Sequence, residues 1–507
     1  MKIKLKDPKT FLAILAISIL ICSNFLQMHY SSDTYVLMDL GYQKYPSEYF
    51  LLDGRFISAI ICYLAGFLNL DYNIYIIAMD FLAIIFLSIA TYQIFMKFQE
   101  IFGLQDKKDL KWLLLALASY VLIFNQYTLE LLVFPESAVM CLGVLLCIKS
   151  AILVVTQKPK KYLKITLMML ISTFCYQGQI NIFPIIAIVL IFMQNANSDK
   201  PIKEKIVEFI KEMLKIGAIL IILITVALCS IKISQHLIGT TLNRGVTLND
   251  KADWEIRVRI VKKYIDALWV NSMNMLPKNT TNIIIIITTI LLILQKNKKE
   301  YIFKYLFTIF AVFCVCVIPM FIFNTGACGR VNIPMSEILG ISLIFILKNM
   351  AKDRKYINKI IILLVIGTFM FNNIMLIRNS TEHIAANRVD QNDGQTIKRL
   401  LEEYESQSGK TVTKFGWFYD KNPGCYSVGI KQIGSLTERK FSCYWCINEA
   451  INFYCERDFE KLGRASNIIY ENEELRLKIM ELQMQDFNEF SEKQVVFYED
   501  IMLLCIY

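Results

Sequence analysis

Residues 11–28 read FLAILAISILICSNFLQM, an apolar run long enough to cross a hydrocarbon layer about 30 Å thick as one helix. Lysines precede this run, as they do in secretory signal peptides, but no small-x-small cleavage site follows it. Many further apolar runs come after it. We therefore predict an uncleaved first membrane helix whose lysine-rich end is cytoplasmic. The lysines are Lys2, Lys4, Lys6 and Lys9.

Apolar runs of similar length recur as far as residue 377. Of the 507 residues, 55% are hydrophobic and 19% are charged, and the mean hydropathy is +0.45. A soluble domain would carry about 25% charged residues. The pattern predicts an all-α polytopic membrane bundle of about eleven transmembrane helices. The predicted spans are 11–28, 74–96, 112–134, 136–156, 163–177, 179–194, 215–233, 281–295, 303–323, 332–348 and 359–377.

The distribution of lysine and arginine predicts the orientation of these spans, because cytoplasmic loops are enriched in both residues. The opposite connections at 127–136, 177–180 and 324–336 carry only one such residue, Arg330, between them. If Phe56–Leu68 also crossed the membrane, loop 97–111 would fall outside. That stretch is short for a span, so we predict an interfacial or re-entrant helix on the outer face. The predicted cytoplasmic segments are the N-terminus and loops 97–111, 157–164, 195–215, 295–304 and 348–359.

The composition of the chain becomes more polar near residue 380. Residues Gln391–Ser406 are polar and helix-forming, and Gly, Pro and Asn turns with short aromatic strands such as Lys493–Tyr498 follow them. We predict a transmembrane domain over 1–380 and a small extracytoplasmic mixed α/β domain over 381–507. The protein is expected in a cell membrane as a multi-pass chain, with its N-terminus cytoplasmic and its C-terminus extracytoplasmic.

The first outer loop is rich in charged side chains. It carries Asp33, Asp39 and Asp53, followed by Arg55. A carboxylate at the lipid–water boundary could accept a proton from an attacking sugar hydroxyl. An arginine beside it could bind a phosphate through paired N–H donors. The alternative is that Ser32 or Asp33 caps a helix and the other charges are solvated.

Three further polar positions lie at the outer ends of predicted spans. Tyr176 and Gln177 stand where two short helices meet, and polar side chains at such depth need partners or a water-filled cavity. Their alternative role is interhelical hydrogen bonding. Arg330 lies in Asn324-Thr-Gly-Ala-Cys-Gly-Arg-Val-Asn332, where it could instead snorkel to lipid headgroups. Glu136 opens a helix, where a carboxylate also gains from the helix dipole.

The loop 235–280 contains a predicted amphipathic helix. Trp254, Val258, Val261, Ile265 and Leu268 recur at helical spacing, while basic residues lie off that stripe. Such a helix suits the outer leaflet, where it would hold anionic headgroups or serve only as an anchor. The basic residues are Arg257, Arg259, Lys262 and Lys263.

Several chemistries lack support in the sequence. The 3 histidines are widely separated, so we predict no metal site. Neither a phosphate-binding G-x-x-x-x-G-K-[ST] loop nor a G-x-S-x-G elbow occurs, and we predict no cofactor. The net charge of +10 is spread between spans, which argues against nucleic acid as a partner. Cys443 and Cys446 form a lone C-x-x-C, and a disulfide in the tail stays open.

The order and membrane side of these motifs resemble a known family. An acidic first loop with Asp33, the element Asp53-Gly54-Arg55, then Tyr176-Gln177 and later Gly329-Arg330 are similar to the bacterial O-antigen glucosyltransferases of the Gtr type II family. The resemblance covers roughly residues 11–380. It implies a GT-C-like fold. This chain departs from the family pattern of two adjacent acids, since Thr34 follows Asp33.

The resemblance implies transfer of a glucosyl or related residue from a polyprenyl-phosphate donor to a cell-surface glycan on the outer face. Asp33 would be the general base, with Asp39 or Asp53 as alternatives, and Arg55 and Arg330 would bind the leaving phosphate. Tyr176 and Gln177 would contact the sugar, with Glu136 and Asn332 completing the substrate site. Expected partners are the lipid bilayer, a donor-synthesising glycosyltransferase and a flippase. Other hypotheses are a polysaccharide polymerase or ligase, and a non-catalytic glycan-lipid transporter.

Overall fold

The computed structural model divides the chain into two compact units. The first comprises Met1–Leu26, Pro46–Leu132 and Glu136–Ile377, and the second comprises Gln27–Tyr45, Val133–Pro135 and Arg378–Tyr507. The second unit thus takes in part of the predicted first outer loop as well as the predicted tail. The structure describes residues 7–104, 106, 109–156, 159–196, 200–239, 254–295, 299–322, 328–350, 354–422, 432–464 and 472–507.

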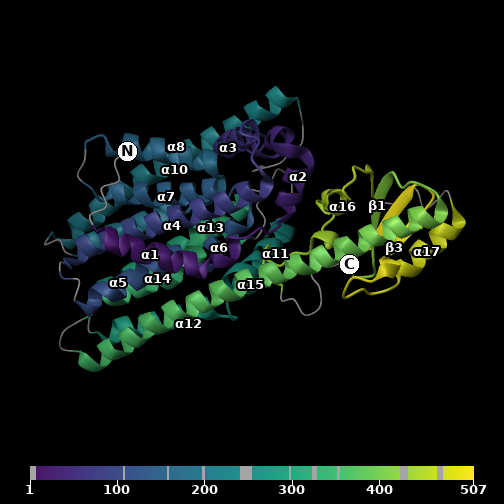
Figure 1. Cartoon of the computed structure of the whole chain (residues 1–507). Helices are drawn as coiled ribbons and strands as arrows, with labels where there is room; N and C mark the ends of the chain where they lie inside the picture. Colours follow the sequence, from purple (N-terminus) through teal and green to yellow (C-terminus); the bar gives the residue numbers. More distant parts are fainter. Residues whose placement is uncertain are drawn as a thin grey trace. The chain divides into compact units, whose positions relative to one another are not determined.

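The first unit is a helical bundle (Figure 1). Its α-helices are α1 (Pro8–Ile21), α3 (Phe56–Phe67), α4 (Tyr72–Phe102), α5 (Leu110–Ile123), α6 (Gln126–Leu129), α7 (Ser137–Val154), α8 (Lys161–Cys175), α9 (Ile182–Asn195), α10 (Ile202–Ile238), α11 (Trp254–Ile265), α12 (Thr280–Leu294), α13 (Lys299–Ile322), α14 (Ile333–Lys348) and the first part of α15 (Lys355–Ser408). Short helical turns are η1 (Ser23–Phe25), η2 (Pro46–Phe50), η3 (Glu130–Val133), η4 (Gln177–Gln179), η5 (Asp266–Val270), η6 (Ser272–Asn274) and η7 (Gly329–Val331).

The interior of this bundle contains helices that are buried on every side. Residues Ile182–Met193 of α9 and Ile333–Leu347 of α14 are all buried. α14 approaches α5 closely, since a Cβ on Gly340 would lie 2.4 Å from the Cα of Leu122. By contrast, α10 leaves large apolar side chains such as Ile221 exposed. An outward apolar face is what a lipid-facing helix requires.

Six helices in the described part of the chain are long and apolar enough to cross a membrane. The count rises to seven if the bent pair Leu110–Ile123 and Gln126–Val133 is one span. Each predicted span overlaps a helix, but the prediction of about eleven is not confirmed as a count of spans. α1, α12 and the predicted interfacial helix α3 are shorter apolar helices. The six are Tyr72–Phe102, Ser137–Val154, Gln177–Asn195, Ile202–Ile238, Lys299–Phe321 and Lys355–Ser408.

The predicted continuous span 112–134 is broken in the structure. The two helical pieces meet at a bend of 50°. Asn125 causes the break, because its side chain accepts hydrogen bonds from the backbone N–H groups of Tyr127 and Thr128 and so starts a new helix. Thr128 completes a capping box by accepting from the N–H of Asn125. The break redirects the chain just before Glu130.

The second unit combines helices with one mixed sheet. The four strands have the order β2-β1-β4-β3, with β1 parallel to both neighbours and β3 antiparallel to β4. Its elements are α2 (Ser32–Tyr45), the end of α15, β1 (Lys414–Tyr419), η8 (Lys440–Ser442), α16 (Ile447–Cys455), β2 (Glu460–Arg464), α17 (Glu473–Gln483), η10 (Glu492–Gln494), β3 (Val495–Tyr498) and β4 (Ile501–Ile506). The predicted strand Lys493–Tyr498 contains β3, and the predicted helix 391–406 lies in α15.

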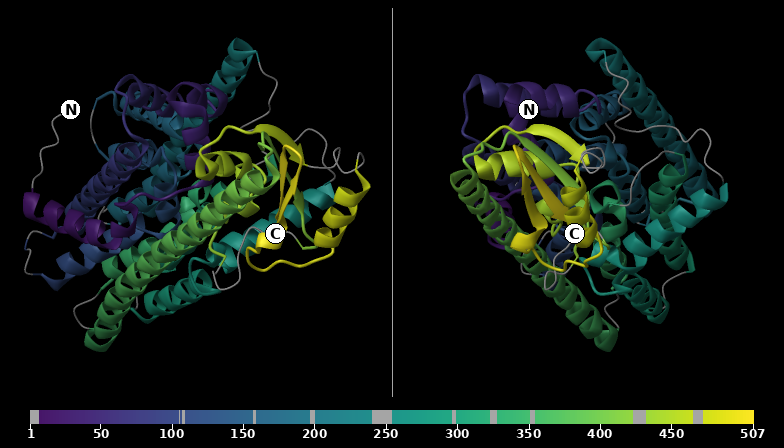
Figure 2. Two further views of the ribbon diagram at one scale, coloured as in Figure 1. Left: turned by 45° about the vertical axis from the view of Figure 1, so that its right-hand side comes forward. Right: turned by 90° about the vertical axis from the view of Figure 1, so that its right-hand side faces the viewer.

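Helices cover both faces of the sheet. Side chains along a strand alternate between the two faces, so each face has its own apolar cluster. Phe415 and Met502 belong to the cluster that packs on α16 and on Leu401 of α15. Phe418 and Leu503 belong to the cluster that packs on α17. Figure 2 shows the yellow and yellow-green strands between these helices. The second unit is therefore a three-layer α/β/α arrangement, in line with the predicted mixed α/β tail.

A buried histidine pair predicts that the second unit loses stability in acid. His29 Nδ1 lies 3.1 Å from His383 Nε2, and His383 Nδ1 lies 2.6 Å from the Leu436 carbonyl oxygen. Burial, with a smaller contribution from Lys440, lowers the pKa of His29 from 6.5 to about 3. As the pH falls, His29 of the unfolded chain therefore binds a proton at a higher pH than His29 of the folded protein does. The contribution of His29 is complete above pH 6.5 and falls between pH 6.5 and 3, by roughly 2 kcal/mol at pH 5.

Hydrogen–deuterium exchange of the full-length protein between pH 7 and pH 5, corrected for intrinsic exchange, measures this effect. Peptides of the second unit should lose protection as the pH falls. His29→Gln can still donate to His383 but does not titrate, so its protection should depend less on pH. An unchanged pH dependence in His29→Gln would contradict the assignment.

Candidate active site

Arg55 lies at the centre of one group of charged residues in the first unit. Its guanidinium is 3.1 Å from Glu136 Oε1 and 3.2 Å from Asp53 Oδ2. The same guanidinium stacks over the Tyr176 ring, at 4.8 Å from the ring centre. Glu136 is only 1% exposed, and a carboxylate so deeply buried needs a paired cation. Glu136 therefore holds Arg55 against Tyr176 instead of merely opening α7.

Arg330 approaches the same tyrosine from another part of the chain. Its Nε donates to the Tyr176 hydroxyl at 3.3 Å. Its backbone N–H and its Nη1 donate to the two carboxylate oxygens of Glu130, at 2.8 and 3.1 Å. Glu130 is 1% exposed. Two arginines thus flank one tyrosine, and each is fixed by a buried glutamate.

Tight backbone packing brings these groups together. Gly54 has a φ of +70°, and a Cβ there would meet side chains of α10 and Gln177 at 3.1–3.2 Å. Gln177 Nε2 donates to the Asp53 carbonyl oxygen at 2.5 Å, which ties the first loop to the α8–η4 junction. A Cβ on Gly329 would lie 2.7 Å from Glu130 Oε2. Both glycines therefore permit the close approach of the charged groups.

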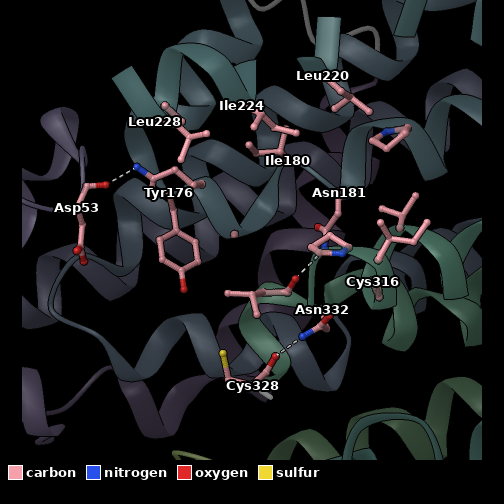
Figure 3. Close-up of a pocket in the computed structure, with 18 of the residues that line it drawn as sticks. Asp53, Tyr176, Ile180, Asn181, Leu220, Ile224, Leu228, Cys316, Cys328 and Asn332 are labelled. Atoms are coloured by element: carbon pink, nitrogen blue, oxygen red, sulfur yellow. Dashed lines mark hydrogen bonds between the residues drawn. The ribbon is translucent and has the colours of Figure 1, made fainter. Parts of the chain in front are cut away.

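A cavity of about 590 Å³ opens beside this cluster. One part of its lining is polar and includes Asp53, Arg55, Tyr176, Gln177, Asn181 and Asn332. The rest is apolar and comes mainly from Leu220, Ile224, Leu228 and Ile231 of α10 and from Cys314, Val315, Ile318 and Pro319 of α13. Figure 3 shows Leu220, Ile224 and Leu228 across the cavity from Cys328 and Asn332. A cavity with one charged end and a long apolar wall fits an amphiphilic ligand.

Hydrogen bonds fix the remaining polar lining. Asn332 Nδ2 donates to the Cys328 carbonyl oxygen at 3.0 Å, and Asn181 Nδ2 donates to the Val331 carbonyl oxygen at 2.7 Å (Figure 3). Burial raises the pKa of the Cys328 thiol, although Arg330 opposes this shift. The thiol is therefore protonated and adds no charge. Asn324–Ala327, the start of the predicted Arg330 motif, lie outside the described residues.

The structure brings most of the predicted site residues together, but not all of them. Asp53, Arg55, Tyr176, Gln177 and Asn332 line the cavity. Glu136 and Arg330 contact that lining through their ion pairs and hydrogen bonds.

Asp33 and Asp39 belong to the second unit. Asp39 accepts from Asn452 at 2.8 Å and lies 3.4 Å from Lys461. Asp33 lies in the first turn of α2. Ser31, instead of Ser32 or Asp33, caps this helix, since its hydroxyl accepts from the Thr34 N–H at 3.1 Å.

The predicted basic helix is present as α11, but its apolar stripe is only partly buried. Val261 and Leu268 are buried, whereas Trp254 and Val258 are exposed. Arg259, Lys262 and Lys263 are exposed as well. Arg257 is half-buried, lies over the Trp254 ring and donates to the Phe321 carbonyl oxygen at 3.4 Å. The exposed apolar and basic groups of α11 are compatible with the predicted binding of lipid headgroups.

Glu130, the partner of Arg330, was not among the site residues predicted from the sequence. This glutamate lies inside the predicted apolar span 112–134, and an ionisable residue at such a position usually has a specific partner. Asn125, Gln126 and Glu130 together could have indicated that the span is interrupted. That Glu130 pairs with a residue 200 positions away could not be read from the sequence.

Comparison with known proteins identifies the family. A family model described as Glucosyl transferase GtrII matches residues 22–372, a range that contains the whole cavity lining and both buried glutamates. Searches of curated proteins and of solved structures found no match. The apolar helices and this match make the chain a membrane glycosyltransferase. It belongs to the glucosyl transferase GtrII family.

We predict that Glu130 acts on catalysis only through Arg330. Glu130→Gln should lower sugar transfer about tenfold, because the amide has one acceptor oxygen where Arg330 requires two. The loss should not add to that of Arg330→Gln in a double-mutant cycle of transfer rates. Glu212→Gln, which removes the partner of Lys215 away from the cavity, should leave transfer unchanged. Additive losses would contradict the positioning role.

Proposed function

We propose that the chain transfers a glucosyl or related residue from a polyprenyl-phosphate-linked donor to a cell-surface glycan on the outer face of the membrane. The observation that carries this proposal is the cavity, whose charged end adjoins an apolar wall of α10 and α13. The lipid chain of the donor would lie along that wall. Its phosphate and sugar would lie at the charged end.

Within this proposal, Arg55 and Arg330 bind the donor phosphate and stabilise the charge that develops on it as the sugar leaves. Asp53 lines the same cavity and is 19% exposed, so it can meet an acceptor hydroxyl and take its proton as the general base. Tyr176, Gln177 and Asn332 contact the sugar, and Glu136 holds Arg55. Asp33 and Asp39, in the second unit, are the alternative bases.

The proposed membrane arrangement is a GT-C-like bundle of about eleven spans with its polar site at the outer face. The lysine-rich loops support it, because lysine and arginine gather on the cytoplasmic side. The basic residues of α11 would hold headgroups of the outer leaflet, the donor's phosphate among them. A lipid-linked donor reaching the cavity sideways would need no soluble nucleotide outside the cell.

The glycans of cells with and without this chain test the proposed function. Loss of a side-branch sugar, with polymer length unchanged, is the expected result. Transfer by the purified protein from a synthetic polyprenyl-phosphate glucose would then establish the donor. Shortened polymers would instead indicate a polymerase or ligase.

The topology can be measured separately by labelling single introduced cysteines with an impermeant thiol reagent. We expect Lys107→Cys, Lys203→Cys and Lys298→Cys to react only after the membrane is permeabilised. Glu473→Cys in the second unit should react in intact cells, or in spheroplasts where an outer barrier is present. Labelling of Lys107→Cys from outside would mean that Phe56–Leu68 crosses the membrane.

A further inference from the structure

The second unit presents two neighbouring aromatic side chains to solvent. Tyr444 and Trp445 are 53% and 43% exposed, in the turn that leads into α16. Their rings meet edge to face with 5.2 Å between centres. Exposing two large rings side by side is unfavourable in water, and such surfaces often mark a binding site.

These two rings adjoin two aromatic side chains of β1, the buried Trp417 and the half-buried Tyr419. Trp417 of β1 lies 6.0 Å from Tyr444 and 5.2 Å from Tyr419, measured between ring centres. Arg464, the last residue of β2, stacks over Tyr419 at 5.3 Å. Figure 1 labels β1, which carries Trp417 and Tyr419, and α16, which the turn with Tyr444 and Trp445 precedes. We call Trp417, Tyr419, Tyr444, Trp445 and Arg464 the aromatic platform.

The chemistry of this platform favours a saccharide over lipid or an aliphatic protein surface. Tyr and Trp combine an apolar ring face with a polar edge, which matches a pyranose, whose C–H face is apolar and whose hydroxyls point outward. Arg464 adds further hydrogen-bond donors. A different surface of the same unit, on α17, exposes Leu477, Met480 and Met484, as a hydrophobic contact would require.

We propose that the aromatic platform binds the saccharide chain of the glycan acceptor. The inference rests on the proposed function, because a glucosyl transferase that modifies a glycan must also hold that glycan. The matched family range ends at residue 372, so the platform lies in the part of the chain beyond it. A saccharide-binding surface there would select the acceptor independently of the residues that bind the donor.

The test is binding of a fluorescently labelled polysaccharide to the full-length protein in nanodiscs. The probe is the surface polysaccharide isolated from host cells that lack this chain. Trp445→Ala should weaken binding at least about tenfold, because it removes one of the two exposed ring faces on which a sugar can stack. Trp445→Phe should restore most of it, because phenylalanine keeps a ring face. Met484→Ala on α17 is the matched exposed control and should bind as the wild type does.

A second measurement separates this inference from the proposed function. The double variant Glu130→Gln/Arg330→Gln, which leaves no buried charge unpaired, should lose most of its transfer activity yet bind the polysaccharide normally. Trp445→Ala should transfer normally only at high acceptor concentration. Wild-type binding that Trp445→Ala leaves unchanged would overturn the platform alone. No binding by the wild type would overturn both the platform and the proposed acceptor. Quenching of Trp445 by brominated lipid, judged against Trp445→Phe, would show that the platform faces the membrane and would also overturn the inference.

Discussion

Asp53→Asn is expected to lower sugar transfer by about 10²–10⁴-fold while leaving the protein folded and in the membrane. The amide keeps the size of the side chain but cannot take a proton from an acceptor hydroxyl. The loss corresponds to roughly 3–5 kcal/mol of activation free energy. The hydrogen bond from Gln177 should survive, because its acceptor is the backbone carbonyl oxygen of residue 53 and not the Asp53 side chain. Initial rates with a polyprenyl-phosphate glucose donor measure the effect.

Asp33→Asn and Asp39→Asn are the matched comparisons, because both carboxylates were candidates for the same role. In the second unit, Asp39 already pairs with Lys461 and accepts from Asn452, so we expect its substitution to alter stability more than chemistry. Full activity in Asp53→Asn together with loss in Asp33→Asn would transfer the role of base to Asp33. Activity in all three variants would remove the acidic first loop from the mechanism.

The helices of the bundle were predictable because a run of apolar residues has few other stable solutions in a membrane. α9 and α14 follow directly from such runs. The interruption at Asn125 was not predicted, although three polar residues, Asn125, Gln126 and Glu130, fall inside the same apolar run. Only the bonds of the Asn125 side chain to the N–H groups of Tyr127 and Thr128 show that it starts a new helix. The region of β3 was predictable because β-branched and aromatic residues that follow turn residues favour a strand.

The candidate site was predictable as a set of residue types, but only partly as a constellation. Arg55, Tyr176 and Arg330 stand near the ends of predicted apolar helices, where polar side chains need partners. The structure brings them into contact. The pairing of each arginine with one particular glutamate depends on contacts far apart in sequence, which spacing cannot reveal. The placement of Asp33 and Asp39 in the second unit was likewise invisible, because they share one sequence segment with Asp53.

Replacing the buried ion pair of Arg330 and Glu130 by two amides should reduce transfer by about 10²–10³-fold, the usual cost of removing one oxyanion-stabilising donor. Arg330→Ala alone would leave the Glu130 carboxylate buried without its cation, and that can cost about 3–5 kcal/mol of stability. The double variant Glu130→Gln/Arg330→Gln avoids this loss, since no unpaired charge remains. Its transfer rate therefore reports on the chemistry and not on folding.

Arg330→Lys distinguishes a general need for positive charge from a need for the guanidinium itself. Lysine keeps the charge but offers no planar fork of donors, so it cannot reach Tyr176 and Glu130 together as Arg330 does. We expect it to recover only a minor part of the activity. Thermal unfolding in detergent should be close to wild type for the double variant, which serves as the control for folding. Wild-type rates in the double variant would show that phosphate is bound elsewhere and would leave Arg55 as the remaining cation at the cavity.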